Sequence, residues 1–339
     1  MTDPLLRFSL GRAVRTAVLG LPLAALWACG GGSGGPSRLL SKPIGSGNLQ
    51  AGTVGLALAE SLRVMVTKDG APLEGATVNW ATRDGGSLSP PTSLSDSSGF
   101  SAARWTLGTM SGVQIARASV SDAAGSPQDF LAEGLPDTPT ALVKPILSGD
   151  GQGGFSNRDL ALPLQAKITD QFGNGVSGQN VGWSVTGDAT LSASTTATGT
   201  DGVAAVFVHL GTTTGPIQIT ASAAGLTNSP VTFTATNSGP LPRTASVLVG
   251  SVDSIYFRSA RNGSTNPAVD TVGVSSRVTW NWVGGQHGIH PIRTPTFTGS
   301  IMLTGAGQSY FYDFTAPGTY DYNCLVHGFA MTGQIVVLP

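Results

Sequence analysis

A thiol, an imidazole and a thioether lie close together near the end of the chain, in the stretch YDYNCLVHGFAMTG from Tyr320 to Gly333. They belong to Cys324, His327 and Met331. The 339 residues include only two cysteines and four histidines, and a second imidazole, His287, follows a Gly-Gly pair in RVTWNWVGGQHGIHPI. Thiolates, imidazoles and thioethers are all metal ligands, so these residue types point first to a metal site.

Strand alternation explains how the C-terminal donors could meet. In GTYDYNC the side chains of Tyr320, Tyr322 and Cys324 share one face of a strand, which puts the thiol at the strand end. The chain then leaves the sheet through LVHGFAM before a last strand, GQIVVLP. A loop at this point can fold His327 and Met331 back toward the thiol.

An earlier strand is expected to supply the second imidazole. In VTWNW the indoles of Trp280 and Trp282 alternate with polar residues, so one face is apolar. After the Gly-Gly turn, His287 and Ile289 share a face and His290 points the other way. With Ile289 in the core, His287 faces inward and can close the site from the side.

The donor types favour copper. One thiolate, two imidazoles and one thioether form the ligand set of a blue-copper electron-transfer centre, with three strong donors and a weak axial one. Zinc is the nearest alternative, but structural zinc prefers two or more cysteines and catalytic zinc leaves a position for water. Cys324 alone could also be a buried structural thiol. Neither His209, isolated between two apolar residues, nor His290 is assigned a ligand role.

At these residues the segment 243–339 resembles the plastocyanin, azurin and amicyanin family, the cupredoxins, through VTWNWVGGQHGI and PGTYDYNCLVHGFAMTGQIVV. The resemblance implies a Greek-key β-sandwich with one type 1 copper per chain. It implies that His287, Cys324 and His327 are the equatorial ligands and Met331 the axial one, with the His327 edge facing a redox partner. Members often carry Asn after the first histidine, where it braces the cysteine loop, whereas this chain has Gly288.

Other function classes find little support. With 18 basic and 19 acidic residues the chain is nearly neutral, so no nucleic-acid partner is expected. The chain offers no Ser/His/Asp arrangement and no phosphate-binding glycine loop before a helix. A catalytic copper would need further histidines, and only His209 and His290 remain. We therefore expect an electron-transfer protein rather than an enzyme, with a protein donor and acceptor such as a cytochrome or a copper oxidase.

The remaining chain reads as short strands and tight turns. Glycine is frequent, at 47 residues, and charged residues make up only 11%. An internal repeat is visible: VNWATRDGGSLS from Val78 corresponds to VGWSVTGDATLS from Val181, and Gly99 matches Gly202 at the same offset. The fold class is therefore all-β, with two sandwich domains at 45–135 and 140–237 before the C-terminal one.

The repeat resembles the bacterial immunoglobulin-like domains of the invasin and intimin type. The match is clearest in ITDQFGNGVSGQNVGWSV and TDGVAAVFVHLGTTTGPIQITASA of the second copy. Trp80 and Trp183 are expected to be core anchors between the sheets, with no disulfide to pack against. The resemblance implies a mechanical role as a spacer, stalk or adhesive surface.

The N-terminus reads as a targeting segment. Three arginines precede the apolar run TAVLGLPLAALWA, which predicts a signal peptide over residues 1–28. The block LWACGGGSGG resembles the lipobox of bacterial lipoproteins, which implies lipidation of Cys29 and a Gly/Ser-rich tether over 29–44. The alternatives are an ordinary secretory peptide cut near Ala28 or an uncleaved anchor. Each of them takes the mature chain out of the cytoplasm.

Together these features predict an envelope lipoprotein of a bacterium, attached to the membrane through its N-terminal lipid and facing the periplasm or the exterior. It carries a blue-copper domain on a two-domain immunoglobulin-like stalk. The alternative is a surface adhesion or structural lipoprotein whose last domain stores copper or holds a vestigial site.

Overall fold

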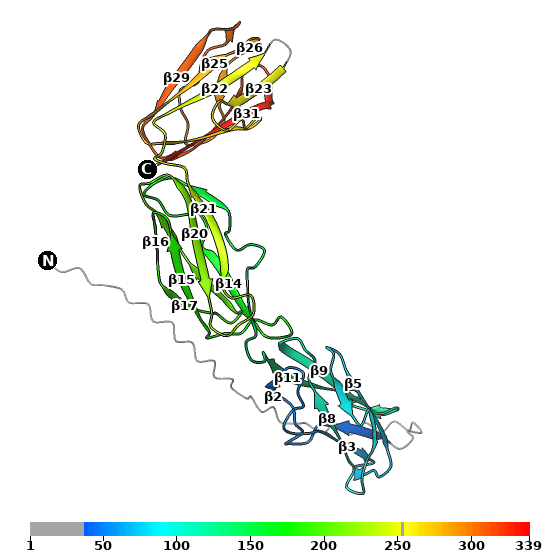
Figure 1. The fold of residues 1–339 in the computed structure, drawn as a ribbon. Helices are drawn as coiled ribbons and strands as arrows, with labels where there is room; N and C mark the ends of the chain where they lie inside the picture. The colour runs from blue at the N-terminus through cyan, green and yellow to red at the C-terminus, as the bar shows by residue number, and fades with distance from the viewer. Residues whose placement is uncertain (1–36, 252–253) are drawn as a thin grey trace, which may run out of the picture.

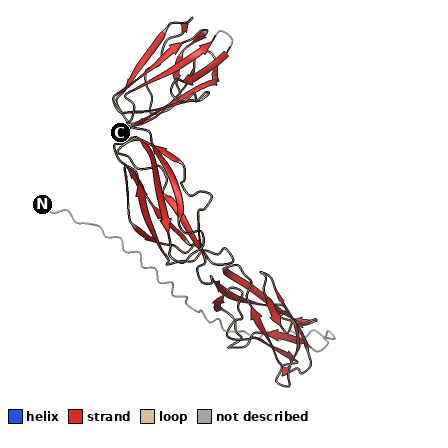
Figure 2. Ribbon diagram, in the orientation of Figure 1, coloured by secondary structure: helices blue, strands red, loops and turns tan. Residues whose placement is uncertain are grey.

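Every regular element of the described chain is a strand. The computed structural model describes residues 37–251 and 254–339, and over these ranges it holds strands only (Figure 2). They gather into three sandwiches that follow one another in a row (Figure 1), each with its own hydrophobic core. This confirms the predicted all-β class. The expected signal peptide (1–28) and Cys29 lie outside the described residues.

The first sandwich packs the sheet β10-β1-β3-β8-β6, with β4 beside β3, against the sheet β2-β11-β9-β5-β7. Its strands are β1 (Arg38–Ser41), β2 (Gln50–Thr53), β3 (Leu62–Lys68), β4 (Ala71–Pro72), β5 (Thr77–Thr82), β6 (Ser87–Ser89), β7 (Thr92–Leu94), β8 (Phe100–Thr106), β9 (Gly112–Ser119), β10 (Ala123–Ala124) and β11 (Gln128–Leu135).

Strand β1 lies inside the range 29–44 that was expected to be a tether. It pairs with β3, and its Leu40 is 1% exposed within the core of the first sandwich. Burial of this leucine explains the difference, because apolar area removed from water stabilises the extra strand. The first sandwich therefore begins ahead of residue 45.

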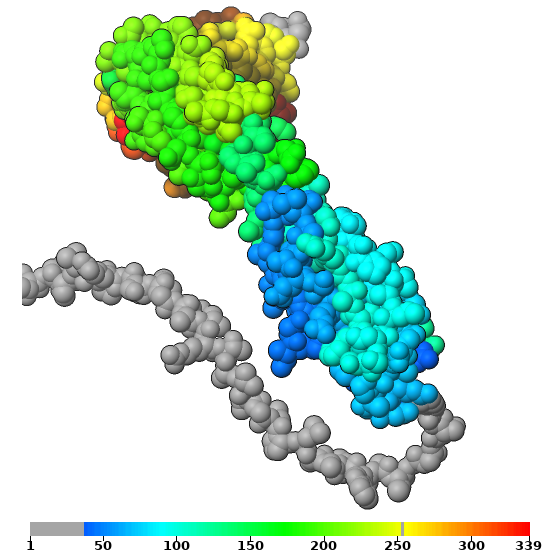
Figure 3. All heavy atoms as spheres, turned by 60° about the horizontal axis from the view of Figure 1, so that its bottom comes forward, coloured from blue at the N-terminus to red at the C-terminus, as the bar shows by residue number. Residues whose placement is uncertain are grey.

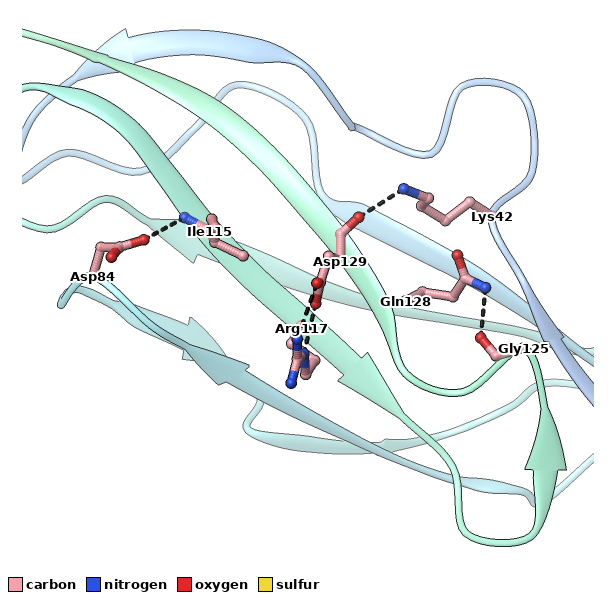
Figure 4. Close-up of polar contacts among 7 residues, drawn as sticks. All are labelled: Lys42, Asp84, Ile115, Arg117, Gly125, Gln128 and Asp129. Atoms are coloured by element: carbon pink, nitrogen blue, oxygen red, sulfur yellow. Dashed lines mark hydrogen bonds and ion pairs between the residues drawn. The ribbon is translucent and has the colours of Figure 1, made fainter.

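Polar contacts on the outer face of the first sandwich accompany the strand register (Figure 4). The guanidinium of Arg117 on β9 donates to both carboxylate oxygens of Asp129 on β11, at 2.6 and 3.0 Å. Lys42 Nζ donates to the Asp129 carbonyl at 2.6 Å, and Ile115 N–H donates to Asp84 at 2.8 Å. Because Arg117 and Asp129 are about half exposed, solvent screens their attraction. The register is therefore fixed mainly by the buried face of the sheet.

The second sandwich repeats this plan. Its sheets are β12-β14-β18, with the pair β16-β19, and β13-β21-β20-β15-β17. Its strands are β12 (Ala141–Val143), β13 (Gln152–Gly154), β14 (Leu164–Thr169), β15 (Asn180–Thr186), β16 (Ala189–Leu191), β17 (Thr195–Ala197), β18 (Val203–Val206), β19 (Val208–Leu210), β20 (Gly215–Ser222) and β21 (Val231–Asn237).

The tryptophans of the repeat occupy equivalent core positions. Trp80 on β5 and Trp183 on β15 are each 5% exposed. The ring centroid of Trp80 is 6.0 Å from that of Phe130, and the ring centroid of Trp183 is 5.9 Å from that of Phe233. Both pairs of rings are tilted by 43°. Each indole N–H donates at 2.8 Å to a hydroxyl oxygen, on β7 in the first copy and on β17 in the second. The sequence repeat is thus a repeat of core contacts, and both tryptophans are the anchors that were expected.

The first two sandwiches meet end to end (Figure 3) through the FGNG turn of the second copy. Asn174 Nδ2 donates to the Thr109 carbonyl at 2.8 Å, and the Ser111 N–H donates to Asn174 Oδ1 at 2.8 Å. Asp170 in turn accepts from the backbone N–H and the side-chain amide of Asn174, at 2.9 and 2.8 Å. Since Asn174 is buried, this polar joint is part of the structure of the stalk.

The third sandwich packs the sheet β23-β22-β25-β29 against the sheet β24-β31-β30-β27, with β26 and β28 paired at one end. Its strands are β22 (Thr244–Ser251), β23 (Ser254–Ser259), β24 (Ala268–Gly273), β25 (Ser276–Trp282), β26 (Gln286–His287), β27 (Ile289–Pro291), β28 (Leu303–Thr304), β29 (Ser309–Phe314), β30 (Gly318–Cys324) and β31 (Gly328–Leu338).

The long strand β31 runs from one end of the third sandwich to the other. Its C-terminal end lies beside the stalk, where Arg158 of the second sandwich donates to the carbonyl of Pro339. It has 11 residues, so at roughly 3.3 Å per residue its start at Gly328 is about 35 Å away. The loop before β31, which holds His327, is therefore at the free end of the molecule (Figure 1).

No helix in the described ranges has the length and apolar character needed to cross a membrane.

Candidate metal centre

Two segments far apart in the sequence bring three donor groups together at this free end. His287 ends β26, Cys324 ends β30, and His327 lies in the turn before β31. The Nδ1 atom of His287 is 3.6 Å from Cys324 Sγ, and the Nδ1 atom of His327 is 3.4 Å from it. The ligand atoms of all three residues lie within 4.8 Å of one another. The structure thus brings His287, Cys324 and His327 together.

Two of the three donor groups are buried, and the third reaches the surface. Cys324 and His287 are 1% and 2% exposed, whereas His327 is partly exposed. The two imidazole rings are 4.9 Å apart, at 47° to each other. Burial lowers the pKa of His287, and the neighbouring His327 lowers it further. A neutral His287 keeps a nitrogen lone pair available to a metal ion.

Two glycines form a cradle for the His287 ring. Gly250 on β22 and Gly285 before β26 have φ angles of +61° and +76°. A Cβ atom at Gly250 would lie 2.1 Å from His287 Nε2, and one at Gly285 would lie 2.5 Å from it. Nε2 is buried with no hydrogen-bond partner. Backbone sterics therefore fix the ring, with its Nδ1 edge toward the sulfur.

The backbone also holds the cysteine turn. The Val326 N–H donates to Cys324 Sγ at 3.4 Å, and the Leu325 N–H donates to the Gly288 carbonyl at 3.0 Å. The hairpin register between β30 and β31 shifts between Asn323 and Cys324, so Cys324 faces Gly328. This irregularity lets the turn bring His327 back toward the sulfur.

The other histidines and the methionine have distinct surroundings. Met331 is fully buried on β31, in the same core cluster as Cys324. His290 is exposed, and its Nδ1 lies 3.0 Å from Asn323 Oδ1. His209 is paired with Asp159 on the stalk, at 2.8 Å. Within residues 37–251 and 254–339, the three-residue group around Cys324 is the only cluster of three or more potential His, Cys, Asp or Glu ligands.

This donor set fits copper. It combines one soft sulfur with two imidazole nitrogens. Residues 255–338 match the family described as copper binding proteins, plastocyanin/azurin family. The C-terminal domain is a cupredoxin. Residues 156–245 match the bacterial Ig-like domain (group 1), which agrees with the resemblance of the repeat. The two matches cover separate parts of the chain.

Three solved structures are similar to parts of this chain. The purple cupredoxin from Nitrosopumilus maritimus is 21% identical, with 28% of this chain and 99% of that chain covered and a TM-score of 0.23. The D0-D1 domain of intimin is 19% identical, with 58% and 94% covered and a TM-score of 0.22. The Escherichia coli adhesin FdeC is 15% identical, with 90% and 97% covered and a TM-score of 0.34. No curated protein matches the chain.

The core beneath the site holds an aromatic cluster and one carboxyl group. Tyr322, two residues before Cys324, is fully buried, with its ring 5.4 Å from that of Trp280. Asp270 is 1% exposed; the Ser259 hydroxyl donates to its Oδ1 at 2.8 Å, and its Oδ2 has no partner. Burial raises the pKa of Asp270. The sequence analysis did not anticipate this group, although the apolar residues Ala268 and Val272 lie on the same face of β24.

Asp270→Asn is expected to flatten the pH dependence of stability of the cupredoxin domain. Because the folded pKa of Asp270 is raised, its charged form is disfavoured in the folded state. The free energy of unfolding of the native chain should therefore decrease as pH rises from the unfolded pKa, about 3.9, to the folded value. Chemical unfolding at several pH values measures this slope.

The matched control for this prediction is Asp313→Asn. Arg277 lowers the pKa of the exposed Asp313, so its contribution has the opposite sign and increases with pH. Equal pH slopes for the native chain and Asp270→Asn would contradict the expectation.

Proposed function

We propose that this chain is an envelope-anchored type 1 copper protein that transfers single electrons between redox partners. The observation that carries the proposal is the buried meeting of Cys324 Sγ with two Nδ1 atoms. It lies in a domain of the copper-binding plastocyanin/azurin family. Bound copper supplies a one-electron couple, and the protein supplies a rigid set of donors that changes little between oxidation states.

We propose that His287, Cys324 and His327 would hold the copper as its three strong donors, with the Met331 thioether as a weak fourth donor. Burial of Met331 in the same core cluster as Cys324 supports this assignment. The glycine cradle holds His287, and the Val326 N–H hydrogen bonds to the sulfur. Such contacts around the ligands tune a metal site without binding the metal themselves.

The surface around His327 is suited to a protein partner. His327 is partly exposed, and the exposed fractions of its apolar neighbours Leu325, Val326 and Phe329 are 49%, 46% and 78%. A group of exposed apolar side chains of this kind is typical of a site that contacts another protein. We propose that electrons enter and leave through His327, with a cytochrome or a copper oxidase as donor or acceptor.

The stalk and the N-terminus give this site a place in the cell. We propose lipidation at Cys29 after removal of residues 1–28, a tether between Cys29 and β1, a first immunoglobulin-like domain that starts with β1 and ends near residue 135, a second at 140–237, and the cupredoxin at 243–339. A lipid at the N-terminus and a site at the opposite, free end would hold the copper away from the membrane. The alternative function is adhesion, with copper storage or a vestigial site.

Copper loading of the soluble chain from Gly30 onward tests the proposal. We expect one copper per chain, an intense visible thiolate-to-copper absorption band, a type 1 paramagnetic resonance signal, and reversible bleaching by a one-electron reductant. A colourless protein with no stoichiometric copper would overturn the electron-transfer function and leave adhesion. Copper that binds but does not cycle would overturn it in favour of storage.

A further inference from the structure

The backbone conformation at Gly288, directly after His287, does not require a glycine. Gly288 is buried between β26 and β27, and its φ lies outside the left-handed region. A Cβ atom there would lie 2.5 Å from Leu325 Cδ1 and 3.2 Å from Leu325 Cγ, with the Ile301 carbonyl oxygen at 3.3 Å. The atoms that chiefly exclude a side chain at position 288 therefore belong to Leu325.

Leu325 directly follows Cys324, so the two segments that supply the donors touch at this point. The Leu325 N–H donates to the Gly288 carbonyl at 3.0 Å. The next residue, Ile289, pairs with Cys324 across β27 and β30. The leucine side chain lies over Gly288 even though 49% of it remains exposed. Movement of either residue would shift a donor.

We infer that Gly288 and Leu325 form a matched pair that positions Cys324 against His287. The leucine fills the space that any side chain at position 288 would need, and the backbone hydrogen bond fixes its turn. An apolar contact and a backbone hydrogen bond thus brace the cysteine turn against the segment that holds His287. Leu325 is a positioning residue. Its role in the metal site rests on the proposed function, whereas the contact itself is a property of the metal-free fold.

A double-mutant cycle tests the pair, using Gly288→Ala, Leu325→Ala and the double variant. The first readout is calorimetric melting of the metal-free chain. Gly288→Ala should lower the melting temperature of the cupredoxin domain by about 4–8 °C, because the new methyl group must displace the half-exposed Leu325 side chain. Leu325→Ala should have a smaller effect, since the side chain is half exposed. The double variant should have the same melting temperature as Leu325→Ala, because the leucine atoms that contact the added methyl group are absent from both.

The second readout is the visible spectrum and reduction potential after copper loading. Gly288→Ala and Leu325→Ala should each shift both relative to the native chain. The double variant should lie closer to the native values than either, because the methyl group added at position 288 occupies part of the space that the leucine leaves. Gly273→Ala is the control: Gly273 is buried in the same domain with ordinary φ, and the atom nearest to an added Cβ is 3.5 Å away. It should change neither readout.

Each readout can fail separately. Additive losses of melting temperature in the double variant, or a Gly288→Ala variant as mild as Gly273→Ala, would show that the two residues are not matched. A native spectrum and potential in Gly288→Ala would show that the pair does not position Cys324. Absence of a visible band in the native chain would instead overturn the proposed function, with the metal-free cycle still deciding whether the pair exists.

Discussion

Replacing Cys324 with serine is expected to abolish the visible absorption band of the copper-loaded chain and to weaken copper binding by more than about 100-fold, beyond the loss usual for residues around the ligands. The hydroxyl of serine is a hard donor that stays protonated at neutral pH, so it cannot replace a soft thiolate. Two imidazoles and a thioether would remain. Absorption, paramagnetic resonance and a copper titration against a competing chelator measure the change.

The substitution should leave the fold intact, because serine is close to cysteine in size and Sγ already lies near two imidazole nitrogens that can hydrogen bond to a hydroxyl. Circular dichroism of the metal-free variant checks this. His209→Ala is the control for a substitution outside the site, since His209 is paired with Asp159 on the stalk. A visible band that survives in Cys324→Ser would show that the thiolate is not a copper ligand.

Much of the fold and the donor types could be predicted from local patterns. Trp80 and Trp183 mark equivalent core positions because the repeat preserves the strands around them. Alternation places Cys324 inward at a strand end, and it separates the buried His287 from the exposed His290. These predictions succeed because a period of two is a local property of the chain.

Contacts between distant segments could not be predicted in this way. Gly250 touches the ring of His287 from β22, and Leu325 fills the space over Gly288, but no spacing in the sequence links either pair. The burial of Asp270 depends on the parallel pairing of β24 with β31. Strand β1 could not be predicted either, because RLLS is too short to show an alternating pattern.

Gly250→Ala is expected to damage the metal site although Gly250 itself offers no donor. The new methyl carbon would lie 2.1 Å from His287 Nε2, within a buried site where the ring has little room to move. The left-handed φ of +61° adds about 1–2 kcal/mol of backbone strain, and overpacking adds about 1–3 kcal/mol. The domain should lose about 2–5 kcal/mol of unfolding free energy, and copper affinity should fall about 10–100-fold, as for other residues that hold a ligand in place.

Gly263→Ala separates the two causes. Gly263 lies in the same domain with a φ of +73°, and no atom lies within 4 Å of a Cβ built there. It should therefore show only the backbone strain, about 1–2 kcal/mol, with unchanged copper affinity. Chemical unfolding and a chelator-competition titration of both variants measure the difference. If Gly250→Ala were to bind copper as tightly as Gly263→Ala, the glycine cradle would not be what holds His287 at the site.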